Sequence, residues 1–407
     1  MPATPRQFDV IVIGAGAAGL MCASVAGQRG RRVLLLEHNG QPGRKILISG
    51  GGRCNFTNLH CGPANFLSEN RHFAKSALAG YQPQHFIELV ERYRIPWHEK
   101  TLGQLFCDGS ARAILDLLLA ECSLGGVELL LNAHGIEVAG AGGEFRVASS
   151  AGEFKAEALV VACGGLSIPL LGASGLGYDL ARQFGLAVVE PRPALVPMVL
   201  GGDEAKWAEL AGIAAEVEAW ARDPKNSARD RIRFREKMLV THRGLSGPAI
   251  LQASSYWRPG DVLIADFAPG RELLKPLIEP RQLTGHPAAS RRDVAAFKQA
   301  LREVLPQRLA AFIAEAGAPQ GWSNPALEAC ERNLHNWIFH PAGTEGFAKA
   351  EVTAGGVDTD CLQARTLEAR AVAGLFFIGE VVDVTGQLGG FNFQWAWASA
   401  AAAGQAL

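Results

Sequence analysis

The sequence lacks long apolar runs, closely spaced cysteines and an excess of either charge. No apolar stretch among its 407 residues approaches the ~18 residues that a transmembrane helix requires. One arginine precedes the first apolar strand, which is not the pattern of a signal peptide. A net charge of −1 provides no global field to attract nucleic acid or membrane. The eight cysteines are scattered without a CxxC pair, as in reduced intracellular proteins, and predict no metal site. We therefore expect a cytoplasmic protein with no membrane partner.

The composition is that of a large, glycine-rich α/β protein. Hydrophobic residues make up 48% of the chain, and 47 residues are glycine. Because 407 residues exceed a typical single core, we expect two or three domains.

The stretch 8–37 has the pattern of a strand, a turn, a helix and a second strand. An apolar run at 9–13 predicts a buried parallel strand, and Gly14, Gly16 and Gly19 then form a GxGxxG. In this motif the first glycine makes a tight turn, the second lets backbone approach a pyrophosphate, and the third lets the helix pack on the strand. Glu37 ends the second strand, where an acid accepts hydrogen bonds from a ribose 2′-hydroxyl. The unit predicts an adenine dinucleotide, and the acid argues against NADP. The same site is expected to include Ala17, Ala18 and His38.

Residues 43–58 form a second candidate ligand segment. Three consecutive glycines, 50–52, suggest backbone that passes close to a ligand, although an ordinary loop has a similar composition. Arg44, Lys45 and Arg53 flank these glycines and suit a diphosphate or an electron-rich ring. The cofactor contacts predicted in this segment are Arg44, Lys45, Ser49, Gly50, Gly51, Arg53 and Asn55.

Cys54 follows Arg53 directly, and a thiol beside an arginine can have a lowered pKa. Flavin disulfide reductases carry a redox cysteine pair in about this place. Here the nearest partner, Cys61, is separated from it by six residues, a poor match to that short motif. A disulfide redox centre is therefore not favoured.

The C-terminal part returns to the dinucleotide domain. A buried strand at 158–163 ends in glycines, and a second one at 374–378 leads to Gly379. In FAD enzymes of this architecture the last strand delivers an acid to the ribitol, a role that fits Asp383. The glycines beyond it open a helix whose N–H groups face the flavin pyrimidine carbonyl, a role that fits Gly389 and Gly390. The cofactor contacts predicted here are Gly164, Gly379, Glu380, Asp383, Gly389, Gly390, Phe391 and Asn392.

Between these parts lies a region of short strands followed by Leu- and Ala-rich helices. Near its start, basic residues alternate with other types, which on a strand places five cations on one face: Arg229, Arg231, Arg233, Arg235 and Lys237. One interpretation is a solvated edge strand that charge protects from aggregation. The other is a stripe that follows RNA phosphates. His242 comes next, in a turn, and either faces a reaction centre or bonds to backbone.

The chain resembles the HI0933-like flavoproteins over nearly its whole length. The motifs that carry the resemblance are GAGAAG, GRKILISGGGRCNFTN, PALVPM, THRGLSGPAIL, VTAGGV and GEVVDVTGQLGGFNFQWAWAS. One departure is Cys163, where the family has threonine. The resemblance implies an α/β fold with a two-dinucleotide-type Rossmann FAD-binding domain, made from residues 1–194 and 343–407. It also implies an inserted barrel-plus-helical substrate domain at 195–342.

The same resemblance implies reduction of an activated C=C bond. Some members are associated with uridine-to-dihydrouridine reduction in large-subunit ribosomal RNA, others with enone reduction in bile-acid steroids. We expect an FAD-dependent reductase that takes electrons from NAD(P)H, with Cys54 as the first candidate proton donor and His242 as the second. The basic stripe favours RNA over a small enone. A non-catalytic RNA-binding protein with structural FAD is the alternative from another class.

Overall fold

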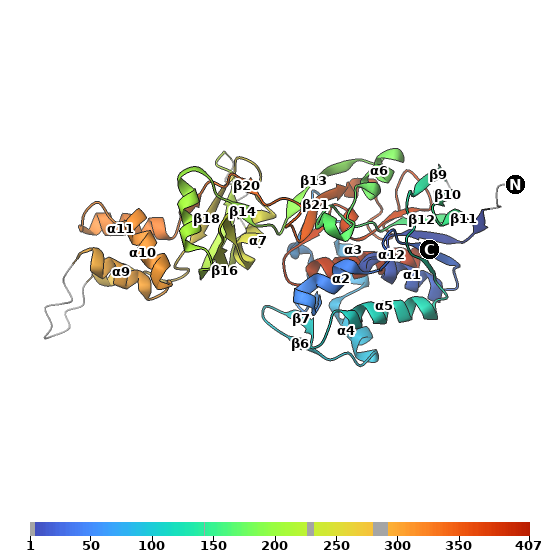
Figure 1. Cartoon of the computed structure of the whole chain (residues 1–407), viewed down its shortest axis with the longest axis horizontal. Coiled ribbons are helices and arrows are strands. Elements are labelled where there is room, and N and C mark those ends of the chain that lie inside the picture. Colours follow the sequence, from blue (N-terminus) through green and yellow to red (C-terminus); the bar gives the residue numbers. More distant parts are fainter. Residues whose placement is uncertain (1–4, 142, 226–231, 280–291) are drawn as a thin grey trace. The chain divides into compact units, whose positions relative to one another are not determined.

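The computed structural model describes residues 5–141, 143–225, 232–279 and 292–407. The chain divides into two compact units (Figure 1). Unit 1 comprises Met1–Pro193 and Glu351–Leu407, and unit 2 comprises Ala194–Ala350. The second junction lies beyond the expected boundary at 342, because β20 (Gly343–Thr344) pairs with β14 (Met198–Val199) of unit 2.

A five-stranded parallel sheet forms the centre of unit 1. Its strands, in spatial order, are β22 (Leu375–Phe377), β12 (Ala158–Val161), β2 (Val10–Ile13), β3 (Val33–Leu36) and β8 (Glu128–Leu130). β2, β3 and β22 are buried along their whole length, as apolar strands covered on both faces should be. The sheet confirms the predicted Rossmann architecture.

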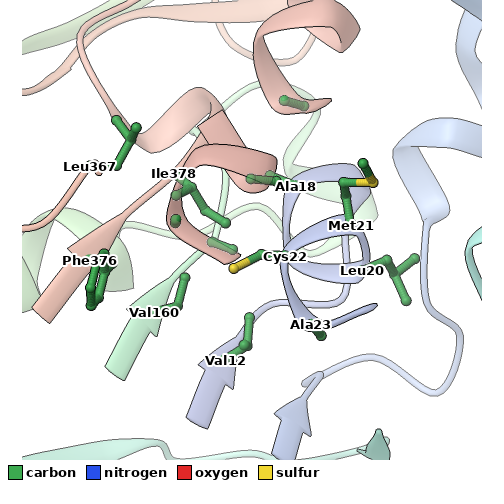
Figure 2. Close-up of a cluster of buried hydrophobic side chains, with 14 of the residues drawn as sticks. Val12, Ala18, Leu20, Met21, Cys22, Ala23, Val160, Leu367, Phe376 and Ile378 are labelled. Atoms are coloured by element: carbon green, nitrogen blue, oxygen red, sulfur yellow. The ribbon is translucent and has the colours of Figure 1, made fainter. Parts of the chain in front are cut away.

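Helices rich in small residues cover this sheet. α1 (Ala17–Gln28) lies against α5 (Arg112–Leu124) and α12 (Phe391–Ala406). Figure 2 shows apolar side chains of α1 gathered beside Val12 of β2 and Val160 of β12. Glycine permits the approach of α1 to α5, since a Cβ on Gly27 would lie 2.5 Å from the backbone oxygen of Gly125.

Smaller elements complete unit 1. One sheet is formed by β1 (Arg6–Gln7), β11 (Gly152–Ala156), β10 (Glu144–Ser149) and β9 (Glu137–Ala141), and another by β4 (Asn55–Asn58), β7 (Gln104–Cys107) and β6 (Trp97–Glu99). Two strand pairs are β5 (Phe66–Leu67) with β23 (Thr385–Gly386) and β13 (Val188–Ala194) with β21 (Val352–Val357). The other helices are α2 (Arg44–Ile48), α3 (Lys75–Gly80), α4 (Pro83–Arg92) and α6 (Leu176–Gln183).

A seven-stranded sheet forms one half of unit 2. Its order is β19 (Trp337–Phe339), β18 (Val262–Asp266), β15 (Ala214–Arg222), β16 (Phe234–Val240), β17 (Gly244–Ser246), β14 and β20. If the sheet were flat, its outer strands would lie about 29 Å apart, at ~4.8 Å per strand. They are consecutive in the chain, however, and the link from Phe339 to Gly343 spans at most about 14 Å. The sheet therefore curls, which brings its two outer strands near each other.

Helices form the other half of unit 2. They are α7 (Pro248–Ser254), α8 (Lys275–Ile278), α9 (Val294–Arg302), α10 (Gln307–Ala316) and α11 (Asn324–Leu334). Sheet and helices share one apolar core, in which the Trp207 ring stacks on Phe267 at 6.1 Å and contacts Phe339 at 4.9 Å. Across the described parts of both units, no helix is long and apolar enough to cross a membrane.

Replacing Gly19 with alanine tests the packing of α1 on the sheet. A Cβ on Gly19 would lie 1.8 Å from the backbone oxygen of Gly14, so the helix must move. We expect Gly19→Ala to lower the free energy of unfolding by about 1–3 kcal/mol in urea titrations. The matched control is Gly80→Ala in α3, where a Cβ meets no atom within 4 Å. Equal stability of the two variants would contradict this account of the packing.

Candidate functional site

The three motif glycines differ in what surrounds them. A Cβ on Gly14 would lie 2.5 Å from the Ala162 oxygen, and Gly19 is equally confined, so packing within the chain requires both. A Cβ on Gly16 would meet no atom within 4 Å. Gly16 is also the N-cap of α1 and has no side chain with which to cap the first-turn N–H groups. This open, uncapped helix end fits a pyrophosphate.

Glu37 lies beneath this turn and is 6% exposed. Its Oε2 accepts a hydrogen bond from Ala15 N at 2.9 Å, and its Oε1 accepts one from Asn39 N at 2.8 Å. Asn39 Nδ2 also donates to Oε1, at 2.9 Å, so one of the carboxylate's about four lone-pair positions, on Oε2, is left for a ribose hydroxyl. Next to it, the buried Nε2 of His38 has no hydrogen-bond partner among the described residues. Both observations fit an adenosine at this place.

Arg44 is engaged within the protein. Its guanidinium donates to Asn39 Oδ1 at 2.8 Å and to the Leu170 oxygen at 3.2 Å. It therefore fastens the loop that follows Glu37 to residues 170–171, and its predicted direct contact with the cofactor stays a prediction.

Glu380 follows β22 and connects four segments of unit 1. Its Oε2 lies 2.6 Å from Lys45 Nζ, and its Oε1 accepts from Ser167 Oγ and from Thr353 N, both at 2.9 Å. Lys45 Nζ also donates to Ser167 Oγ at 2.6 Å. Only a fifth of the Glu380 side chain is exposed, so this polar network is largely shielded from water.

Asp383 occupies a different environment. It is 4% exposed, and its Oδ2 accepts a hydrogen bond from Glu69 N at 2.9 Å. Burial raises the pKa of its carboxyl group. Asp383 and Glu380 are both engaged within the protein, so the ribitol contact predicted for Asp383 stays a prediction.

The N-terminus of α12 lies against β4. Gly390, the N-cap, has φ +95°, and a Cβ there would lie 2.4 Å from the Thr57 oxygen. The Asn55 amide oxygen, turned to accept, lies 3.2 Å from Gly390 N. Asn392 Oδ1 accepts from Gly386 N at 2.8 Å, and the buried Phe391 ring packs edge-on against Phe66. These residues brace the helix end that the sequence predicts to face the flavin.

The triple glycine adopts the left-handed conformation throughout, with φ of +57°, +67° and +83° at residues 50–52. A Cβ on Gly51 or on Gly164, which has φ +73°, would meet no atom within 4 Å, so both backbones are open to a ligand. Gly50 is confined instead, because a Cβ there would lie 2.8 Å from the Phe106 ring. Ser49 Oγ donates to the Ile46 oxygen at 2.7 Å, while Arg53 is exposed.

Cys54 lies in the apolar core of unit 1. It has no accessible surface, and burial raises the pKa of its thiol, where the sequence suggested a lowered one. A solvent-borne substrate cannot touch a side chain without accessible surface. The structure therefore gives Cys54 no geometric basis as proton donor. All eight cysteines are described and free.

The basic stripe is only partly described, since Arg229 and Arg231 lie outside the described residues. β16 pairs with β15 from Phe234 to Leu239 but with β17 only at Leu239 and Val240, so the interpretation of the stripe as an edge strand stays a prediction. Arg235 Nε lies 2.8 Å from Glu216 Oε1, and Arg233 Nη1 lies 3.2 Å from Glu218 Oε2. Cross-strand glutamates thus balance two of the cations, while Lys237 is exposed.

His242 is exposed in the turn between β16 and β17 of unit 2. With Arg243 it lines a small cleft of about 160 Å³ whose other walls are largely apolar: Val199, Leu200, Ala205, Ala208 and Gly244. Arg243 Nη1 lies 3.6 Å from Glu345 Oε2. The imidazole is therefore accessible from solvent.

Comparison with known proteins identifies the family. The model described as the HI0933-like protein Rossmann domain matches residues 8–406. The chain belongs to the HI0933-like family. A ribosomal RNA dihydrouridine synthase of Escherichia coli is 48% identical, over 99% of this chain and 98% of that protein. One from Haemophilus influenzae is 41% identical over 97% of each. A 3-dehydro-bile acid delta(4,6)-reductase of Clostridium scindens is 27% identical over 97% of this chain and 98% of that protein.

Among solved structures, the chain is similar to a flavocytochrome c3 fumarate reductase, with a TM-score of 0.46 at 15% identity over 99% of this chain and 78% of that one. Membership in the HI0933-like family confirms the predicted Rossmann-type FAD-binding domain and a flavin oxidoreductase. The sequence analysis did not predict that Ser167 and Thr353 belong to the polar network around Glu380. The available signal for Thr353 was a polar residue inside the apolar strand of the VTAGGV motif.

Gly16→Val tests the site without disturbing the fold. The valine side chain meets open space within the protein but occupies the place proposed for the pyrophosphate. We expect the variant to keep its circular dichroism spectrum and melting temperature when both proteins are stripped of flavin, and to purify with little FAD. Gly16→Ala, with a smaller obstruction, should retain an intermediate amount. A Gly16→Val protein that carries a full complement of FAD would refute the assignment.

Proposed function

We propose that this protein reduces uridine to dihydrouridine in large-subunit ribosomal RNA, as an FAD-dependent enzyme with NADH or NADPH as electron donor. The observation that carries the proposal is the 48% identity, over practically the whole chain, to the E. coli ribosomal RNA dihydrouridine synthase. Reduction of a small enone is the second candidate, and the more distant bile-acid reductase favours it. Identity to the RNA-modifying relatives is much higher, so we rank RNA first.

The residues of unit 1 would hold the cofactor. The N-terminus of α1 at Gly16 would bind the pyrophosphate, Glu37 would bind the adenosine ribose, and Asp383 would bind the ribitol. Glu380 would be a further contact, and its ion pair with Lys45 fixes the direction of the Glu380 carboxylate. Bound FAD supplies an electron pair.

The uracil C5=C6 bond is conjugated to a carbonyl, so it accepts the electron pair and a proton at C6 and leaves an enolate. A positioned acid then protonates C5 of the enolate, which gives dihydrouridine. With Cys54 buried, we propose His242 as this acid, because its side chain is exposed and histidine is the most frequent general acid in enzymes.

Two matched variants test the proton donor. We expect Cys54→Ala to react within a few-fold of wild type, because its thiol is inaccessible. His242→Asn should reoxidise on substrate about 10²–10⁴-fold more slowly, the usual contribution of a general acid. Both should be reduced by NAD(P)H at the wild-type rate. Rapid-mixing kinetics that follow flavin reduction and reoxidation separately would measure this, and a slow Cys54→Ala with a normal His242→Asn would reverse the assignment.

The substrate is tested in cells and with purified protein. Large-subunit rRNA from cells that lack this protein should contain uridine at a position where wild-type rRNA contains dihydrouridine. Mass spectrometry distinguishes the two, because dihydrouridine carries two more hydrogens and is about 2 Da heavier. Purified protein with NADPH or NADH should restore it. Reduction of an enone with untouched rRNA would favour the second candidate. If the flavin is never reoxidised by RNA that the protein binds, the protein is a non-catalytic RNA-binding protein.

A further inference from the structure

The turn between β6 and β7 presents an exposed leucine in an unfavourable backbone conformation. Leu102 has φ +54° and is 62% exposed. Left-handed turn positions usually hold glycine or asparagine, because a Cβ is disfavoured there. Because most of the Leu102 side chain is exposed, it contributes little to the stability of the fold. Fold stability therefore does not explain why this position holds a leucine.

Backbone hydrogen bonds hold the turn in place. Lys100 N donates to the Gln104 oxygen at 2.9 Å, and Gln104 N donates to the Thr101 oxygen at 3.1 Å. From the side, Leu59 N donates to the Gly103 oxygen at 2.9 Å. The tip is thus a fixed support.

A buried amide ties this tip to the proposed FAD site. Asn58, which is 1% exposed, donates through Nδ2 to the Leu102 oxygen at 3.1 Å and to the Gly389 oxygen at 2.8 Å. The Gln104 side chain also lies beside Gly389. Gly389 and Gly390 precede α12, at the end predicted to face the flavin pyrimidine. Leu102 is therefore anchored directly to the part of the site where the reaction would occur.

The surroundings of the tip suit a polyanion. His60 lies beside Gly103, and both His60 and Lys100 are exposed. Lys100 Nζ lies 5.2 Å from the centre of the Phe106 ring, which supports its stem at the surface. Glu99, the last residue of β6, is exposed as well. An exposed apolar tip with the Lys100 ammonium beside it matches RNA, whose phosphates lie around its stacked bases.

We propose that Leu102 is a wedge that enters the base stack of the substrate RNA and takes the place of the target uracil when that base is extruded towards the flavin. The inference rests on the proposed function, since only a stacked base needs to be extruded. Enzymes that act on a base take it out of the stack, and apolar side chains inserted between bases are a known means of doing so. A rigid tip suits this role because little conformational entropy remains to be lost.

Leu102→Gly separates a role in RNA from a role in the fold. Glycine relieves the unfavourable φ, so the variant should melt at the same temperature as wild type or higher. FAD content and the rate of flavin reduction should be unchanged. Turnover of folded rRNA should fall about 10–100-fold, because unstacking is no longer compensated. Leu102→Met should retain most turnover. The control is Leu124→Ala, which truncates a leucine that is 73% exposed at the end of α5 and should change nothing.

A spectroscopic readout tests the wedge without turnover. In an rRNA fragment, 2-aminopurine beside the modified uridine should brighten when wild-type protein unstacks it and stay dim with Leu102→Gly. Wild-type turnover by Leu102→Gly, or slow turnover with wild-type brightening, would overturn the inference. In either case wild-type protein still forms dihydrouridine, whereas failure of the proposed function would show as wild-type protein that leaves rRNA unmodified.

Discussion

The close packing of α1 on the parallel sheet is the constraint on which the rest of unit 1 depends. It is possible because Gly14 and Gly19 lack side chains at the crossing of strand and helix. It places the first turn of α1 at the carboxyl edge of the sheet, where N–H groups and the helix dipole favour a phosphate. α12 packs on α1 through similarly small residues, so that a Cβ on Gly404 would lie 2.8 Å from Val25. The site is thus positioned by backbone contacts that larger side chains would prevent.

The network around Glu380 joins parts of unit 1 that are far apart in the sequence. Lys45 comes from the N-terminal part, Ser167 from the segment after β12, and Thr353 from β21. A partly shielded ion pair of this kind contributes modestly to stability, because desolvation offsets the attraction. Its larger effect is on geometry, since each Glu380 oxygen has a fixed donor. The network thus holds segments from both parts of the discontinuous unit 1 in fixed positions at the proposed ligand site.

In unit 2, pairing with a neighbouring strand partly neutralises the basic stripe. In the sequence, the alternating basic residues predict a row of cations on one face of the strand. Beside β15 its arginines meet Glu216 and Glu218, and Arg233 also lies over the Trp220 ring at 4.0 Å. Cross-strand pairs of opposite charge are ordinary units of sheet stability. The described arginines therefore carry a weaker argument for RNA than their spacing suggested.

Local features of the sequence were sufficient for the strand–turn–helix unit and for the fold class, because apolar periodicity and glycine spacing act over a few neighbouring residues. The accessibility of Cys54 was not local, since its burial depends on β4 pairing with β7 and on the core beneath them. The partners of Glu380 and Asp383 depended on the turn at Gly379–Val381, after which one acid pairs with Lys45 and the other accepts a hydrogen bond from residue 69. The partners of Arg233 and Arg235 were fixed by strand register across a long connection. Only tertiary structure decides such questions, because burial and pairing depend on residues that are distant in the chain.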